Sequence, residues 1–165
     1  MTDAEAANAA LIERFYSAFQ RHEGETMAAC YTADARFSDP VFTDLRGAQV
    51  GAMWRMLCER GKDLELTYSD VEAEGELGSA NWVADYTFSA TGRKVHNVIT
   101  AGFRFEDGLI AQHHDQFDLW RWSRQALGPM GVLLGWSPPV QGKIRGQAKE
   151  GLAAFMASDP PPAAE

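Results

Sequence analysis

The feature that most restricts the fold is a change in hydrophobic period near the middle of the chain. Up to about residue 60 the apolar residues recur at helical spacing, and from about residue 64 to residue 117 they alternate with polar ones. A period of two places neighbouring side chains on opposite faces of a strand. Helices followed by a strand meander predict an α+β fold, with a curved antiparallel sheet wrapped around N-terminal helices.

Three helices are expected in the first part. The first covers Ala6–Phe19, and the third follows Gly47. A short second helix is expected to carry Met27, Cys30 and Tyr31. The segment ARFSDPVF is expected to be extended, since the residue before a proline is driven out of the helical region.

The alternating strands are expected around residues 64–68, 82–88 and 95–105. The turn sequences ATGR and FEDG lie between consecutive strands at hairpin spacing, and a last strand follows FEDG. These strands form the predicted meander.

The C-terminal part should contain a broken apolar segment and one further helix. SRQALGPMGVLLGW is interrupted by glycines and Pro129, so it cannot form one regular helix. Ser137 and two prolines are typical of a helix start, which predicts a helix over Val140–Met156. We therefore predict one domain over residues 1–157 with this helix appended, and a disordered tail over residues 158–165.

Composition limits the possible partners. With 15 Lys and Arg against 23 Asp and Glu the net charge is −8, which disfavours nucleic acid and anionic membrane as partners. The N-terminus lacks the pattern of a secretory signal and no apolar stretch is long enough to cross a bilayer, so a cytoplasmic protein is expected. Cys30 and Cys58 are then expected to be reduced thiols in helices.

The segment IAQHHDQFDLW places two histidines and two aspartates in the last strand. Alternation turns His113 and Asp115 to the apolar face and sends His114, Gln116 and Asp118 to the opposite face. The inward pair could be metal ligands, an acid/base pair, or satisfied polar residues that complete the core. A metal is disfavoured because no third ligand is evident: His22 lies at a helix end and His96 on the other face. No glycine-rich nucleotide loop is present, so no cofactor is expected.

The chain resembles the nuclear transport factor 2-like superfamily, which includes ketosteroid isomerases, polyketide cyclases, scytalone dehydratase and limonene epoxide hydrolase. The matching segments are ALIERFYSAF, YTADARFSDPVFTDLRG, TFSATGRKVHN, FRFEDGLI and HHDQFD. The resemblance implies a cone-shaped α+β barrel with a deep apolar pocket between the helices and the concave sheet face. It is closest to the polyketide-cyclase-like branch, and it is weak for the reaction, because this fold serves unrelated chemistries.

The resemblance also implies catalytic residues. Asp39 matches the isomerase general base, and Asp115 falls at or near the cyclase aspartate, with His113 on the same face. A turn residue before Pro40 is an equally good interpretation of Asp39. The isomerase oxyanion positions hold Phe15 and Ala101, with Tyr16 beside Phe15 but rotated away on the helix, so a standard ketosteroid isomerase is not expected. Epoxide hydrolase chemistry is less well matched, because Arg104 points outward.

The expected substrate-binding residues are mostly aromatic. Asn97 is included as the one polar inward residue of its strand, and the set is Phe15, Tyr16, Trp54, Trp82, Tyr86, Phe88, Asn97, Ile99 and Phe117. Further wall candidates are Phe19, Leu57 and Phe103, for which a plain core role is the preferred interpretation.

Two functions remain open. The first is a cofactor-independent acid/base enzyme of isomerase, cyclase, dehydratase or epoxide hydrolase type, acting on a small hydrophobic molecule through Asp39, His113 and Asp115. The second is a non-catalytic module that binds a lipophilic ligand or forms a dimer. A homodimer is expected in either case, with Trp120, Trp122 and Trp136 as possible contributors to its interface.

Overall fold

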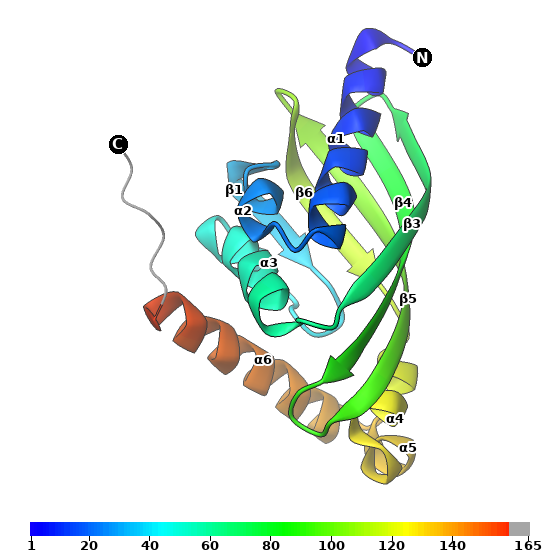
Figure 1. The fold of residues 1–165 in the computed structure, drawn as a ribbon, viewed down its shortest axis with the longest axis vertical. Coiled ribbons are helices and arrows are strands. Elements are labelled where there is room, and N and C mark those ends of the chain that lie inside the picture. The colour runs from blue at the N-terminus through cyan, green and yellow to red at the C-terminus, as the bar shows by residue number, and fades with distance from the viewer. Residues whose placement is uncertain (159–165) are drawn as a thin grey trace.

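In the computed structural model, which describes residues 1–158, three helices cover the concave face of a curved six-stranded sheet (Figure 1). This arrangement confirms the predicted α+β fold. The predicted disordered tail lies outside the described residues, except that Ser158 is the last residue of the final helix.

The sheet has the strand order β2-β1-β6-β5-β4-β3. Its strands are β1 (Tyr31–Ser38), β2 (Leu45–Arg46), β3 (Glu65–Glu74), β4 (Leu77–Phe88), β5 (Arg93–Glu106) and β6 (Leu109–Gln116). All neighbouring strands are antiparallel except β1 and β6, which are parallel. The predicted meander corresponds to β3–β6. Strand β1 joins the sheet beside β6 and runs parallel to it.

The N-terminal helices are α1 (Asp3–Gln20), α2 (Gly24–Ala28) and α3 (Ala48–Arg60). A capping box fixes the start of α1: the Glu5 backbone N–H donates to Thr2 Oγ1 at 3.1 Å, and the Thr2 backbone N–H donates to Glu5 at 2.7 Å. The prediction for the second helix was partly wrong. Cys30 lies in the turn after α2 and Tyr31 begins β1, since this short helix ends where the strand period begins.

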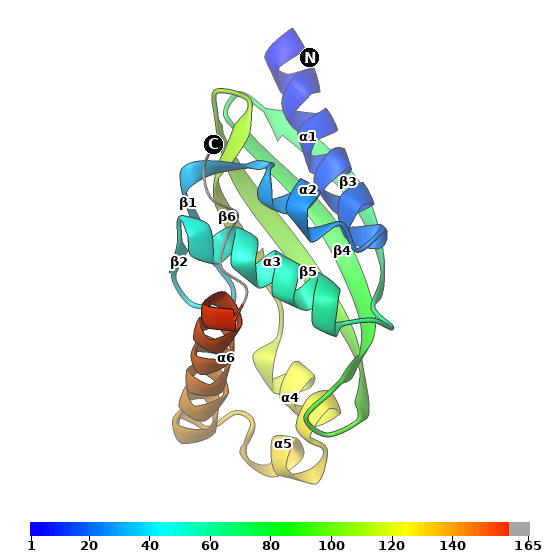
Figure 2. The same cartoon turned by 60° about the vertical axis from the view of Figure 1, so that its left-hand side comes forward.

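The C-terminal part contains α4 (Leu119–Leu127), α5 (Pro129–Leu134) and α6 (Pro138–Ser158). Gly128 separates α4 from α5 with a φ of 68°, a value that favours glycine, which confirms that the segment is not one helix. The predicted last helix is confirmed as α6. It crosses beside α3 and buries Leu152 and Phe155 in the main core (Figure 2).

Two apolar clusters hold the layers together. The main core lies between α1–α3 and the concave sheet face. A smaller cluster of Val95, Leu119, Trp122 and Ala126 lies where α4 packs against β5. Within residues 1–158, no helix is both long and apolar enough to cross a membrane.

Candidate functional site

The register of β5 and β6 sets which side chains meet on the concave face. Phe103 pairs with His113 and Ala101 pairs with Asp115. His113 and Asp115 are each 2% exposed, whereas His114 and Gln116 are exposed on the other face. The predicted alternation of the last strand is therefore confirmed, and Asp118 caps the N-terminus of α4.

His113 and Asp115 belong to a buried hydrogen-bond chain. His113 Nε2 lies 2.9 Å from Asp115 Oδ1, and His113 Nδ1 lies 2.6 Å from the Tyr31 hydroxyl. Trp54 Nε1 donates to the Tyr31 oxygen at 2.9 Å, and Trp82 Nε1 donates to Asp115 Oδ1 at 3.4 Å. We call these five residues the His113 network.

The donors in the His113 network determine the histidine tautomer. Because the Tyr31 oxygen accepts from Trp54, its own hydrogen is free to donate to His113 Nδ1. His113 then carries its hydrogen on Nε2 and donates it to Asp115. Burial raises the pKa of Tyr31 well above its ordinary value, as does the charge of Asp115, so Tyr31 remains a hydroxyl donor. Both ring nitrogens of His113 are thus satisfied inside the protein.

Most predicted wall residues pack against one another around this network. Phe15 and Trp54 meet edge to face with ring centroids 5.2 Å apart, and Phe19 and Trp54 do so at 5.3 Å. Ile99, Trp82 and Phe103 are buried in the same core, and Leu57 packs against it. In this structure the innermost of the predicted wall residues are therefore core residues. For Phe19, Leu57 and Phe103 this is the interpretation preferred from the sequence.

Tyr16 was predicted to be a substrate-binding residue that is rotated away from the oxyanion position held by Phe15. In the structure it is fully buried and stacks on Tyr68 with ring centroids 5.4 Å apart. The width of the concave face allows two neighbouring positions of α1, Phe15 and Tyr16, to pack inward together. The Tyr16 hydroxyl is buried and has no hydrogen-bond partner in the described part of the chain.

Asp39 lies at the turn after β1, outside the main core. Its Oδ1 accepts the backbone N–H groups of Val41 at 2.7 Å and Phe42 at 2.6 Å, so the predicted turn role is confirmed. Burial raises the pKa of Asp39 from 3.8 to about 7; the backbone bonds oppose this rise and the charge of Asp115 adds to it. The residue is partly buried, and its second carboxyl oxygen makes no hydrogen bond within residues 1–158.

Asp39 lies near the smaller apolar cluster. Val41, Tyr86, Phe88, Phe117 and Ile144 are partly buried and pack against that cluster, and together with Asp39 we call them the Asp39 cluster. Trp122 Nε1 donates to the Tyr86 hydroxyl at 2.7 Å. Burial raises the pKa of Tyr86, with a contribution from the charge of Asp39. Three of the predicted site residues, Tyr86, Phe88 and Phe117, therefore pack at this cluster, and Asp39 is close enough for its charge to act on Tyr86.

Helix α6 also contacts the Asp39 turn, where Arg145 Nε donates to the Pro40 carbonyl at 2.9 Å.

Asn97, the predicted polar wall residue, is buried on the inward face of β5, paired with Ala84. Its side-chain amide makes no hydrogen bond among residues 1–158.

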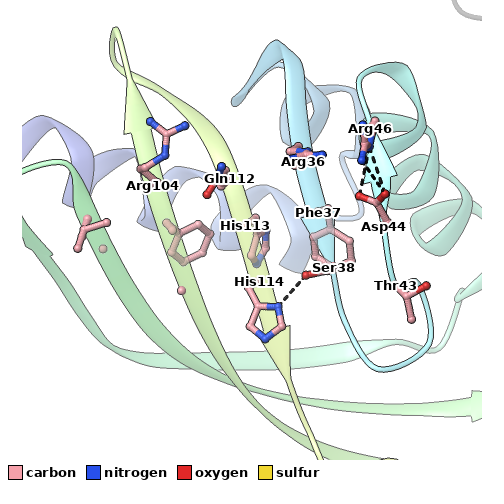
Figure 3. A pocket seen from close by; sticks show the side chains of 14 residues that line it. Arg36, Phe37, Ser38, Thr43, Asp44, Arg46, Arg104, Gln112, His113 and His114 are labelled. Atoms are coloured by element: carbon pink, nitrogen blue, oxygen red, sulfur yellow. Dashed lines mark hydrogen bonds and ion pairs between the residues drawn. The ribbon is translucent and has the colours of Figure 1, made fainter.

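The opposite face of the sheet carries an open groove of about 740 Å³ (Figure 3). The outward residues Arg36, Gln112 and Arg104 line it, and Ser38 Oγ lies 2.7 Å from His114 Nδ1. His114 thus has a separate partner on a separate face from His113. Within the described chain, no group of three or more His, Cys, Asp or Glu is arranged to hold a metal ion.

Sequence reasoning missed Tyr31 and the Trp122–Tyr86 contact. Tyr31, Ala35 and Phe37 are buried at odd positions of β1, so extending the alternation back from ARF would have found Tyr31. The Trp122–Tyr86 contact has no such signal, because it depends on where α4 docks.

Comparison with known proteins places this geometry in a known fold. A profile of the SnoaL-like domain matches residues 12–113. TsrD from Streptomyces laurentii is 28% identical with a TM-score of 0.62, over 73% of this chain and 94% of TsrD. A Jannaschia protein named as a SnoaL-like polyketide cyclase has a TM-score of 0.69 at 16% identity, over 78% and 97% of the two chains.

An LEH-like epoxide hydrolase of M. tuberculosis has a TM-score of 0.61 at 18% identity, over 79% of this chain and 96% of its own. A search of curated protein sequences found no match. At such identities the two enzyme-named structures indicate the fold and not the reaction.

Proposed function

The chain belongs to the SnoaL-like domain family, within the nuclear transport factor 2-like superfamily, and from that premise we propose that it is a cofactor-independent enzyme that transfers a proton on a small hydrophobic molecule. The reaction is of isomerase, cyclase, dehydratase or epoxide hydrolase type. Asp39 is the proposed proton-transfer group, and its surroundings supply the substrate-binding surface.

The observation that carries this proposal is the environment of Asp39. A carboxyl group with a pKa near 7 is present in both protonation states at neutral pH, which suits a residue that accepts a proton and returns it. The apolar members of the Asp39 cluster would contact an apolar substrate, and Asn97 on the inward face of β5 is the proposed polar contact. A flat hydrophobic substrate would therefore bind with its reacting carbon or oxygen near the free carboxyl oxygen.

The His113 network has a supporting role in this proposal. Asp115 is 2% exposed and already accepts hydrogen bonds from His113 and Trp82, so a substrate has no path to it in this packing. Its charge raises the pKa of Asp39. His113 and Asp115 would then tune the base, whereas Asp39 contacts the substrate.

Hydrogen exchange on a carbon acid tests the forms of the proposal in which Asp39 takes a proton from carbon, and hydrolysis of a panel of hydrophobic epoxides tests the hydrolase form. The wild-type protein is incubated in D₂O with a panel of hydrophobic cyclic ketones, and deuterium uptake beside the carbonyl is followed by NMR. Asp39→Asn keeps the acceptor oxygen of the turn but cannot take a proton, so exchange should fall by about 10² to 10⁴, the usual contribution of a positioned acid or base.

Two variants make the result specific. Asp44→Asn removes the same charge at an exposed residue paired with Arg46, and it should exchange like the wild type. Asp115→Asn should retain exchange with a shifted pH dependence. If Asp115→Asn abolishes exchange and Asp39→Asn does not, Asp115 is the base and the proposed role of Asp39 is wrong.

A non-catalytic binding or dimerisation module is the second candidate. The close packing of the predicted pocket walls favours it, because little of the concave face is left open. Wild-type protein that binds a hydrophobic fluorescent probe, exchanges no hydrogen on any ketone tested, hydrolyses no epoxide tested and sediments as a dimer would support this alternative.

A further inference from the structure

Helix α5 is packed in an unusual orientation. Its glycines face α4: a Cβ atom at Gly131 would lie 1.9 Å from the Ser123 carbonyl oxygen, and one at Gly135 would lie 2.6 Å from Ser123 Cβ. Only glycine allows this close approach. Because the glycine side faces the protein, the large apolar side chains of the same short helix face outward.

The result is a contiguous group of exposed apolar residues, which we call the α5 patch. Leu133 is 69% exposed and Trp136 is 63% exposed, and the whole group is Trp120, Met130, Val132, Leu133, Leu134 and Trp136. Both views place α5 at the pole of the molecule opposite the N-terminus (Figures 1 and 2). An exposed group of this kind on a small protein marks a surface that contacts something apolar.

The chain segment that contains the α5 patch has the opposite charge to the rest of the chain. Residues 119–149 contain Arg121, Arg124, Lys143, Arg145 and Lys149 and no Asp or Glu. The remaining residues contain ten Lys and Arg against all 23 Asp and Glu. The whole-chain charge of −8 therefore hides a basic segment that carries the exposed apolar group.

Two contacts position basic side chains, Arg124 and Arg93, beside α4 and α5. The Arg124 guanidinium lies over the Trp120 ring, 4.1 Å from its centroid. Arg93, the first residue of β5, donates to the Gln125 carbonyl at 2.9 Å and lies against Gly128, between α4 and α5. Asp118 is the nearest acidic residue in sequence, and its carboxylate is engaged in capping α4.

We propose that the α5 patch attaches the protein to the surface of an anionic lipid bilayer. Tryptophan and leucine side chains would enter the headgroup and acyl boundary, and Arg121 and Arg124 of α4, which packs on α5, would contact lipid phosphates. A symmetric dimer through this patch is disfavoured, because a two-fold axis would place the cations of one copy against those of the other. The additional inference that a hydrophobic substrate reaches Asp39 from the bilayer rests on the proposed function.

Vesicle co-sedimentation tests this proposal. The wild-type protein should bind vesicles of phosphatidylcholine with about 30% phosphatidylglycerol, bind pure phosphatidylcholine at least tenfold more weakly, and be released as salt is raised. Leu133→Glu should weaken binding at least tenfold. The matched control is Leu77→Glu, since Leu77 is a leucine 60% exposed beside the β3–β4 turn, and this variant should bind like the wild type.

Each other outcome overturns the proposal. Wild-type protein that stays in the supernatant with anionic vesicles excludes membrane attachment, and conversion of a dimer to a monomer by Leu133→Glu in that case would make the α5 patch a protein interface. Equal loss in Leu133→Glu and Leu77→Glu would mean that added negative charge, and not the patch, governs binding. Asp39→Asn should bind vesicles like the wild type, so failure of the catalytic proposal is separately visible.

Discussion

Asp115 and Asp39 are two carboxyl groups held away from bulk water by the same domain, but their surroundings differ. Asp115 faces two N–H donors from side chains of other positions, His113 and Trp82, and is closed in by the main core. Within residues 1–158, Asp39 accepts hydrogen bonds only from the backbone of its own turn, and it is partly buried near a smaller cluster. Asp115 is therefore part of the packed main core, whereas Asp39 can bind and release a proton without disturbing that core.

The difference shows that burial alone does not identify a catalytic carboxylate. A buried carboxylate with aimed donors supports the fold, since removing it leaves those donors unpaired. A desolvated carboxylate with few donors and an open side is suited to proton transfer. Replacing Asp115 should therefore lower stability more than activity, and replacing Asp39 should lower activity more than stability.

The largest stability effect should come from Asp115→Ala. This change leaves the N–H groups of His113 and Trp82 without an acceptor in the core and creates a small cavity. We expect the free energy of unfolding to fall by about 2–4 kcal/mol, measured by urea denaturation at pH 7. A loss below about 0.5 kcal/mol would show that the His113 network contributes little to the fold, which would remove the contrast with Asp39.

A pH-dependent effect of intermediate size is expected for Asp39→Asn. The folded pKa of about 7 lies above the ordinary value of 3.8, so the folded state binds more protons than the unfolded state between these values. The contribution of Asp39 to stability therefore falls as pH rises from about 4 to 7 and remains low above pH 7. The variant lacks this loss and should exceed the wild type by about 1–3 kcal/mol at pH 8, with almost no difference at pH 4.

Urea denaturation of both proteins at pH 4, 6 and 8 measures this trend. Asp44→Asn is the control with the opposite sign, because the Arg46 side chain holds the pKa of Asp44 below its ordinary value. That variant should be less stable than the wild type above pH 4. Parallel curves for Asp39→Asn and the wild type would mean that Asp39 is not desolvated in solution.

The sequence predicted the fold and the inward pair, because both depend on periodicity. Alternation along one strand fixes which face His113 occupies, and no other element is needed for that inference. The partners of His113 depend on which strand lies beside β6 and on how α3 packs over it, so the Tyr31 contact was not predicted. Similarly, whole-chain charge concealed the basic segment around α5, since an average carries no information about position.

The environment of Asp39 required the structure for a further reason. The sequence offered both a turn residue and a base, and the structure shows that the turn bonds use one carboxyl oxygen. Its raised pKa depends on burial by segments distant in sequence, including α6, which contacts Pro40 through Arg145. No local pattern could have indicated that contact, because 105 residues separate the two positions.

The smallest effect should come from His114→Gln, which tests the strand register that the comparison requires. His114 is exposed on the outer face, where its ring nitrogen Nδ1 lies 2.7 Å from Ser38 Oγ. Glutamine can replace that hydrogen bond, so the free energy of unfolding should change by less than about 0.5 kcal/mol and hydrogen exchange on ketones should be unchanged. His113→Gln, one position away, should cost about 2–4 kcal/mol, because the amide cannot span Tyr31 and Asp115 in the packed core. A reversed ranking of the two variants would place His114 inside, and a one-residue slip of β6 would turn Asp115 outward as well. Asp115 would then not be buried in the core, and the contrast between a buried Asp115 and a partly buried Asp39 would be wrong, whatever the chemistry at either residue.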